Sequence, residues 1–369
     1  MRLVDLLHRW TGAVVGLLLA LMGLSGTLLA HKDLWVAAPG ARDAQVQDTA
    51  ALAVAVERIM ADPATRPQSI LFATKSFGLD RLSFGGEAGA YAMQNGVIVE
   101  RWSSKWERPE LWLFDLHHHL LSGDTGEAVL GVAALFGLGF VVTGFILWWP
   151  LRRSFDFRVW PKNGSRFAIL RHHRDWGALL APILALVLAT GALMVFRPLT
   201  NVVFGPGAEA EIKAALAAPK APKSDLAADP NWRGMLETAR RLYPDAEVRA
   251  LALPRDKSGL IALRLRQPGE WLPNGRTMVW FAADTGRLVE ARNAQTLPTQ
   301  VRAYGAVYPL HAGKVGGLAY RLVVTLAGLG LTLFGSLTVW TFWFRRKPQK
   351  PTRARRPKDA AAPVGQVPQ

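Results

Sequence analysis

Residues 128–151 read AVLGVAALFGLGFVVTGFILWWPL, and no charged side chain interrupts them. Three other stretches, 11–30, 176–196 and 322–344, are also free of charged residues. Each has the roughly 20 residues that a helix needs to cross about 30 Å of hydrocarbon, and the glycines in them suit close helix packing in lipid. Four such runs are too many for the buried core helices of a soluble protein. The sequence therefore predicts an integral membrane α-helical bundle with four transmembrane helices.

The segments that flank these runs are strongly basic. Residues 1–10, 152–175 and 345–369 together hold seventeen Lys and Arg but only four Asp. The positive-inside rule places such segments in the cytoplasm, so we expect a multi-pass protein of the bacterial inner membrane with both termini cytoplasmic. The basic tail is then a topology anchor on anionic lipid and not a nucleic-acid site. A cleaved signal peptide, the alternative for the first run, is disfavoured because the run is long for one.

The composition excludes several kinds of site. The 369 residues carry a formal charge of +16 and contain no cysteine. Disulfides, iron–sulfur clusters, thiolate zinc sites, cysteine nucleophiles and covalently attached haem are therefore excluded. The expected partner is the lipid bilayer, and no nucleic acid is expected.

Two segments of mixed polarity, 32–115 and 198–309, are expected outside the cytoplasm. In each, a helical stretch precedes four strand-like runs. In the first segment these are 50–61, then 69–75, 81–84, 90–94 and 97–101. In the second they are 232–242, then 247–254, 260–266, 277–283 and 287–290. We expect one helix on a small antiparallel sheet in each segment, that is, two α+β domains. The Ala/Pro/Lys stretch 214–230 is predicted to be a mobile insertion.

The chain thus divides into eight parts, and their order repeats. They are the N-terminus and first span (1–31), the first outer domain (32–115), the second span (116–151), the basic loop (152–175), the third span (176–197), the second outer domain (198–309), the fourth span (310–344) and the basic tail (345–369). His8 precedes Gly26 by 18 residues, and His173 precedes Gly191 by the same number. The repeated order and spacing predict an internal duplication.

All eight histidines lie within a few residues of a predicted span. Those at the cytoplasmic ends are His8, His172 and His173. Those at the outer ends are His31, His117, His118, His119 and His311. Ionisable groups beside lipid are costly and commonly functional, and imidazole is the most common nitrogen ligand of metals. The alternative is that these histidines only hydrogen-bond headgroups or backbone.

The surroundings of the histidines indicate which metal group they hold. No thiolate is present, and the four uncharged runs hold no Asp or Glu that could complete a hard-oxygen or di-iron site. Two histidines from different helices, in a slot lined by Gly, Leu and Trp, suit haem b with two axial nitrogens. Nearby arginines, which are placed to pair with propionates, are Arg9, Arg174 and Arg321. Because His8 and His31 are roughly 34 Å apart along a helix, we predict two haems, one near each face.

The spacing leaves some of the axial ligands open. The inner candidates are His8 with His173, and His172 as the competitor. The outer candidates are His311 with one of His117, His118 and His119, and also His31. His117 shares the Leu-His pattern of Leu310-His311, whereas His119 matches by its distance to the terminal Trp of the span. His31 is either an outer ligand or a residue that tunes the haem.

Several short motifs, taken in order, resemble a known family. They are Leu-His-Arg-Trp-Thr-Gly at 7–12, Leu116-His117, Thr143-Gly144 before Trp148-Trp149, and Leu310-His311. The sequence from about residue 3 to 346 resembles the PepSY-associated transmembrane family, and Asp284-Thr285-Gly286 resembles the end of a PepSY repeat. In layout it is most similar to inner-membrane ferrisiderophore reductases, which are four-helix proteins with two haems.

This resemblance implies both a fold and an activity. The two outer domains would be PepSY-like and periplasmic. Two haem b groups, ligated by His8, His173, His311 and one of residues 117–119, would carry electrons to a periplasmic Fe(III)–siderophore. Reduction would release iron because Fe(II) binds hard oxygen chelators poorly. No nucleotide-binding fingerprint is visible, so the electron donor would be a quinol or a cytoplasmic protein.

Two other functions compete with this one. The chain could be a non-catalytic membrane component whose outer domains bind peptides or proteins. It could also be a metal or haem transport partner, but its spans lack the broken, charge-bearing helices expected of a transporter.

Overall fold

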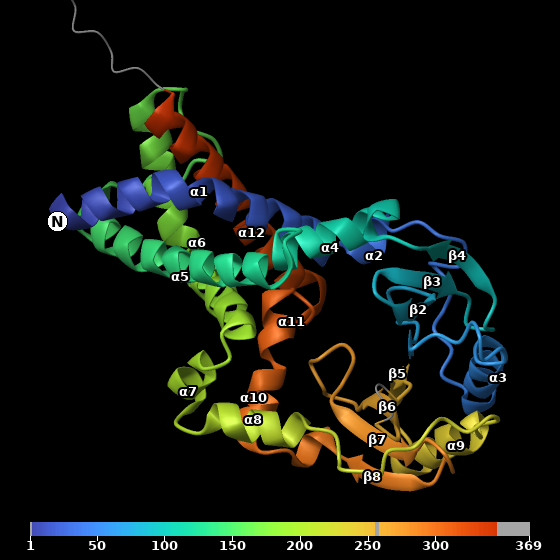
Figure 1. Ribbon diagram of the computed structural model, residues 1–369. Helices are drawn as coiled ribbons and strands as arrows, with labels where there is room; N and C mark the ends of the chain where they lie inside the picture. The colour runs from blue at the N-terminus through green and yellow to red at the C-terminus, as the bar shows by residue number, and fades with distance from the viewer. Residues whose placement is uncertain (1, 255–257, 345–369) are drawn as a thin grey trace, which may run out of the picture.

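Four long helices form a bundle in the computed structural model, which describes residues 2–254 and 258–344 (Figure 1). They are α1 (Arg2–Ala30), α5 (Gly123–Trp148), α6 (Arg166–Val195) and α12 (Gly317–Trp343). All four are long and apolar enough to cross a membrane. The four predicted spans are therefore confirmed, whereas the basic tail predicted at 345–369 lies outside the described residues.

Glycines let the backbones of α1 and α12 touch. A Cβ atom on Gly23 would clash with the carbonyl oxygen of Gly328, and one on Gly335 would clash with that of Gly16. Such close approach is possible only where neither helix carries a side chain. Elsewhere the bundle is filled by large apolar side chains, among them Leu19, Leu180, Leu184, Leu188 and Phe334.

Eight strands outside the bundle form one antiparallel sheet. They are β1 (Ser69–Leu71), β2 (Asp80–Gly85), β3 (Ala88–Ala92), β4 (Ile98–Trp102), β5 (Glu247–Ala252), β6 (Leu260–Arg266), β7 (Thr277–Ala282) and β8 (Leu288–Arg292). Their order across the sheet is β4-β3-β2-β1-β5-β6-β7-β8. All eight strands occur where alternating polarity predicted them, with ends that differ by a few residues.

The expectation of a separate small sheet in each outer segment was wrong. Strands β1 and β5 pair with each other, with Ile70 opposite Leu251, so one sheet runs through both segments. An edge strand leaves backbone N–H and C=O groups unpaired, and this pairing closes one edge of each half. We call β1–β4 the first lobe and β5–β8 the second lobe.

Two amphipathic helices cover one face of the sheet. They are α3 (Thr49–Ile59), capped by Asp48, and α9 (Trp232–Leu242), capped by Asn231. The buried core beneath them contains apolar side chains from both helices and both lobes, among them Val56, Leu236, Ile70, Leu251, Ile261 and Leu263. In Figure 1 both helices lie on the side of the sheet away from the long helices, so the opposite face is turned toward the bundle.

Two of the predicted spans begin later than the sequence indicated. Residues 116–151 were assigned to one span, but α4 (Pro109–His119) ends at its third histidine and α5 begins at Gly123. Leu120 and Leu121 lie between them with φ of 48° and 59°, a left-handed conformation that breaks the helix. Likewise α11 (Val307–His311) is separate from α12. His117, His118, His119 and His311 therefore lie on short helices and not on the spans, whereas His31 lies in the turn between α1 and α2.

Further short helices follow the long helices or connect the bundle to the sheet. They are α2 (Lys32–Trp35), α7 (Leu199–Phe204), α8 (Ala208–Leu216), α10 (Thr299–Gly305) and the 3-10 turns η1 (Lys105–Glu107), η2 (Trp149–Ser154) and η3 (Ala294–Thr296). Of these, η2 continues from α5 at the sheet-distal end of the bundle. The stretch 214–230 was predicted to be a mobile insertion. In the structure its first residues belong to α8, and Ser224 forms a bridge with Ser258.

Candidate functional site

Four of the eight histidines meet as two pairs, one toward each end of the bundle. The ring centroids of His8 on α1 and His173 on α6 are 6.3 Å apart. Those of His117 on α4 and His311 on α11 are also 6.3 Å apart. We call the first two the sheet-distal pair and the second two the sheet-proximal pair. Each pair takes one histidine from each half of the chain.

This spacing suits two imidazoles on opposite sides of one metal ion. A metal–imidazole bond is about 2 Å long and the bonded nitrogen lies about 1 Å from the ring centre, so two opposed ligands have centroids roughly 6 Å apart. The ring centroid of His118 also lies 5.8 Å from that of His117, so the sheet-proximal pair has a third imidazole beside it. Within residues 2–254 and 258–344, no three His, Asp or Glu side chains gather into a metal site.

Hydrogen bonds fix the tautomers of the sheet-proximal pair. Ser25 on α1 donates its hydroxyl proton to the Leu21 carbonyl at 2.8 Å, and its Oγ lies 2.8 Å from His117 Nδ1. Because that proton is already used, His117 Nδ1–H is the donor and Nε2 keeps its lone pair. His311 Nδ1 donates to the Val187 carbonyl at 2.9 Å. Both rings thus present Nε2 as the free nitrogen, which is the arrangement that positions metal-binding imidazoles.

The two histidines of the sheet-distal pair differ in their partners. His8 Nδ1 lies 2.8 Å from Thr143 Oγ1 on α5, and that hydroxyl donates to a helix carbonyl at 2.6 Å. His8 therefore also donates through Nδ1. The buried Nδ1 of His173 has no partner among the residues that the structure describes. Phe140 and Phe334 contact the rings of His8 and His173 edge-on, so the walls here are apolar.

A hydroxyl residue followed by glycine holds three of the four imidazoles. The motifs are Ser25-Gly26, Thr143-Gly144 and Thr190-Gly191, and they adjoin His117, His8 and His311. A Cβ atom on Gly26 or Gly191 would lie 2.9 or 3.1 Å from Cε1 of the adjacent histidine, so these two glycines leave room for a ring, whereas one on Gly144 would lie 3.5 Å from Cε1 of His8, an ordinary contact. Sequence reasoning treated Gly26 and Gly191 as marks of the duplication and Thr143-Gly144 as a motif of the family, and missed this role. The repeated hydroxyl–glycine dipeptide was the signal that could have found it.

The missing partner of His173 has a simple local cause. Thr143 lies five residues before Trp148 in the second span. At the same distance before Trp340, the fourth span carries Gly335, which offers no hydroxyl. The glycine at this position instead allows the close contact between α1 and α12.

The other four histidines have partners of their own. These contacts are His118 stacked on Phe114 (4.0 Å between centroids), His119 Nδ1 with Asp115 (3.0 Å), His172 Nε2 with the Val159 carbonyl (3.0 Å) and His31 Nε2 with Thr325 (2.8 Å). Successive residues on a helix point about 100° apart, so residues 117–119 fan out around α4. The structure places His117 next to His311 and turns its two neighbours to other partners.

Burial keeps the sheet-proximal pair neutral. It lowers the pKa of His117 to about 3, with the nearby His311 as a further cause. Burial also lowers the pKa of His311. Both residues lie outside the four spanning helices and are uncharged at pH 7. A neutral imidazole is the form that binds a metal.

Two cavities adjoin the sheet-proximal pair. The first, of about 230 Å³, is lined by both histidines, by Gly, Ala and Leu residues of the bundle, and also by His118 and the charged Lys32, Glu127 and Lys314. The second, of about 650 Å³, lies between the sheet and this end of the bundle. The cavities share the residues Lys32, Phe114, Tyr308 and Lys314. The two cavities are therefore neighbours that share part of their walls.

Two of the three arginines expected to pair with propionates have protein partners. Arg9 forms an exposed ion pair with Asp5 at 3.5 Å, and Arg174 pairs with Asp175 at 2.8 Å. Arg321 lines the larger cavity, and its buried Nε has no partner within the described residues. Of the three, Arg321 is thus the one with hydrogen-bonding capacity left for a ligand.

The sequence matches a known family over almost its whole length. The family described as the PepSY-associated TM region matches residues 6–346, which include both histidine pairs and all eight strands. A search of curated proteins gives no match.

Proposed function

The chain belongs to the PepSY-associated transmembrane family, and from this premise we propose that it is a haem-containing membrane oxidoreductase. In this proposal it passes electrons from one end of the bundle to the other and reduces a ferric siderophore beside the sheet. The observation that supports it is the two histidine pairs, each at the spacing of opposed metal ligands and each formed by both halves of the chain.

The residues of both sites fit haem b. His8 and His173 would hold one group, and His117 and His311 would hold the other. Haem bound there would supply a reversible one-electron Fe(III)/Fe(II) couple. The chain orients the imidazoles through helix hydroxyls and excludes water with apolar walls. Ser25, which contacts His117, lies 17 residues beyond His8 on α1, so the pairs are separated by roughly 25 Å along that helix.

The proposed reaction is a one-electron reduction. A quinol or a reduced cytoplasmic protein gives up one electron, and siderophore-bound Fe(III) becomes Fe(II). Iron then leaves the chelate because Fe(II) binds hard oxygen ligands weakly. The basic segments at 1–10 and 152–175 support an inner-membrane location with these segments in the cytoplasm and the sheet in the periplasm.

Absorption spectroscopy of the purified full-length protein tests this proposal. We expect a Soret band, dithionite-sensitive α and β bands and about two haems per chain by pyridine haemochromogen assay. Ferric siderophores added to the reduced protein should reoxidise these bands. A colourless protein from haem-replete cells would contradict the proposal and favour the alternative of a non-catalytic component that binds peptides or proteins.

Matched histidine variants test the assignment of ligands. His8→Ala should remove the sheet-distal haem alone, and His311→Ala should remove the sheet-proximal haem alone. The controls are the neighbouring His172→Ala and His119→Ala, which should keep two haems because these rings bond to Val159 and Asp115. Loss of both haems from His8→Ala, or of one from either control, would contradict the assignment.

A further inference from the structure

The larger cavity is built from both lobes and from the sheet-proximal end of the bundle. Its sheet wall is the face opposite α3 and α9, and its other wall comes from α2, α4 and three residues between 308 and 321. The two lobes meet along the β1–β5 pair, so the middle of the sheet wall lies at this seam. A molecule that fills the cavity would contact both lobes at once.

A β-bulge in β5 places Arg249 on the cavity wall. Val248 and Leu251 are both buried in the core beneath α3 and α9. The two residues between them, Arg249 and Ala250, therefore both lie on the cavity face. The pairing of β5 with β6 shifts by one residue between Val248 and Ala250, which leaves Arg249 as the extra residue of the bulge. Bulges commonly redirect a side chain toward a functional site.

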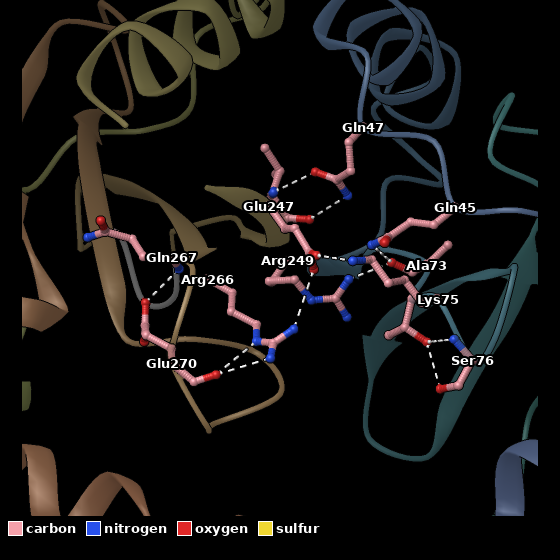
Figure 2. A network of polar contacts seen from close by, with 12 residues as sticks. Gln45, Gln47, Ala73, Lys75, Ser76, Glu247, Arg249, Arg266, Gln267 and Glu270 are labelled. Carbon is pink, nitrogen blue, oxygen red and sulfur yellow. Dashed lines mark hydrogen bonds and ion pairs between the residues drawn. The ribbon is translucent and has the colours of Figure 1, made fainter. Parts of the chain in front are cut away.

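Arg249 is buried with part of its guanidinium unpaired. It is 1% exposed, and its Nη1 donates to the Ala73 carbonyl. Its Nε and Nη2 have no hydrogen-bond partner among the described residues. Figure 2 shows that the adjacent Glu247 is engaged elsewhere, by Lys75 at 3.6 Å and Arg266 at 3.8 Å. The free Nε and Nη2 atoms form one edge of the guanidinium, the edge that binds both oxygens of a carboxylate.

Besides Glu247, Asp80 is the carboxyl group whose charge acts on Arg249, and Asp80 does not supply a full negative charge. Asp80 is 1% exposed, and one of its oxygens accepts a hydrogen bond from the Ala73 amide. Its other oxygen has no partner within the residues described. Burial raises the pKa of Asp80 to about 7, despite the opposing effects of the Ala73 hydrogen bond and the charge of Arg249. Near neutral pH this carboxyl is therefore only partly ionised.

The cavity as a whole carries an excess of positive charge. Nine Lys and Arg side chains line it, against five Asp and Glu. For five of these cations, no carboxylate of the described residues lies within ion-pair distance: Lys32, Arg81, Arg249, Arg264 and Arg321. Desolvation lowers the pKa of Lys32, Arg249 and Arg264, as expected of cations short of counter-charge. Of the five, Arg249 is buried, and an unpaired buried charge is costly. A bound anion would offset that cost.

We propose that this cavity binds an anionic metal chelate through its carboxylate groups, with Arg249 as the anchor at the seam between the lobes. Arg81 from the first lobe and Arg264 from the second face the same space and add to the attraction. This inference rests on the proposed function, because it names the substrate class as ferric chelates of net negative charge. The cavity shares wall residues with the smaller cavity that the sheet-proximal pair lines, so a chelate held here would lie next to the site proposed to reduce it.

The test measures binding of gallium(III)–citrate, a redox-inert anionic chelate, to the full-length protein by isothermal titration calorimetry. We expect saturable binding that weakens as ionic strength rises. The cationic complex gallium(III)–desferrioxamine B should bind at least tenfold more weakly. Equal or tighter binding of the cationic complex would overturn the proposal. Equal binding of free citrate would also overturn it, because the cavity would then recognise a carboxylate and not a chelate.

Variants locate the site within the cavity. Arg249→Met should weaken gallium(III)–citrate binding at least tenfold, because a charge-assisted pair of hydrogen bonds is lost. Arg264→Met, on the accessible wall, gives a second variant in case the buried change impairs folding, and it should weaken binding several-fold. Arg302→Met is the matched control, since this exposed arginine on α10 lies outside the cavity. Unchanged affinity in Arg264→Met and Arg249→Met would overturn the proposal.

The test of the anion site and the test of the proposed function can succeed or fail independently of each other. Haem content is read from the spectrum, whereas gallium binding requires no electron transfer. A red protein that does not bind gallium(III)–citrate would refute the anion site and leave the oxidoreductase standing. A colourless protein that binds it with the expected charge preference would do the reverse.

Discussion

Helix hydroxyls act on the histidines without being candidate ligands themselves. Ser25, Thr143 and Thr190 each donate a proton to a carbonyl of their own helix, and each lies within hydrogen-bond distance of an imidazole Nδ1. A hydrogen bond at Nδ1 makes the opposite nitrogen more basic and fixes the ring. The three residues are therefore expected to tune the sites and not to build them.

Thr143→Val tests this tuning role with almost no change of side-chain volume. The variant removes the acceptor for His8, so we expect the midpoint potential of the sheet-distal haem to rise and its haem to be held 10–100-fold more weakly. Redox titration followed at the α band measures the potential, and pyridine haemochromogen assay measures retention. Thr338→Val is the control, because that hydroxyl bonds only to carbonyls of its own helix. A shift of both potentials, or of neither, would refute the role.

At the scale of residues, the sequence predicted a set of candidate histidines but not which of residues 117–119 pairs with His311. All eight histidines lie within a few residues of a predicted span, and His8, His173 and His311 stood out among them by the spacing of the duplication and by the Leu-His motif. The choice among residues 117–119 depends on how α4 is rotated about its axis, which periodicity does not report. Arg249 gave no signal at all, because a bulge is a feature of strand pairing and leaves no mark in a single strand.

Helix crossings in the bundle depend on single glycines. The contact between α1 and α12 has Gly16 and Gly23 on one helix facing Gly335 and Gly328 on the other. Apolar side chains have little tendency to associate in lipid, so close backbone packing contributes much of the contact energy.

Gly23→Leu should separate these two helices. Its side chain would meet the carbonyl of Gly328, and we expect a loss of about 3 kcal/mol or more of stability from overpacking. Thermal unfolding in detergent, followed by size-exclusion chromatography, measures the loss. Gly12→Leu is the matched control on the same helix, since a Cβ there has no neighbour within 4 Å in the described part of the chain outside its own backbone. Equal melting temperatures for the two variants would contradict the crossing.

Most of the long helices and strands were predictable from the sequence. The pairing between the two halves of the sheet and the breaks before two of the spans were not. Uncharged runs gave the four spans, and alternating polarity gave all eight strands. The pairing of β1 with β5 joins residues about 180 positions apart and uses edges that look alike in sequence. The breaks before α5 and α12 were also missed, because Leu120 and Leu121 adopt a conformation that leucine rarely takes.

At the scale of the whole molecule, each histidine pair takes one residue from each half of the chain. His8 and His117 come from the first half, and His173 and His311 from the second. Neither half can form either pair alone. This sharing follows from the packing of α1 with α12 and of α5 with α6, which interleaves the two halves in one bundle.

Splitting the chain in the loop before α6 tests this dependence. Residues 1–163 and 164–369 expressed separately should each lack haem, and coexpression should restore about two haems per complex. The measurement is the absorption spectrum of the affinity-purified fragments. Uncleaved chain purified in parallel gives the reference stoichiometry. A full haem complement in one fragment alone would show that the pairs do not form as the structure places them.

The seam between β1 and β5 also has a consequence for how the protein is made. Two membrane spans, α5 and α6, separate these strands in the chain. The first lobe must therefore emerge from the ribosome and wait, with the β5-facing edge of β1 unpaired, until the third span and β5 have been translated. An open strand edge invites aggregation, and a short edge limits it. At three residues, β1 exposes only a short open edge to other chains while the sheet is incomplete.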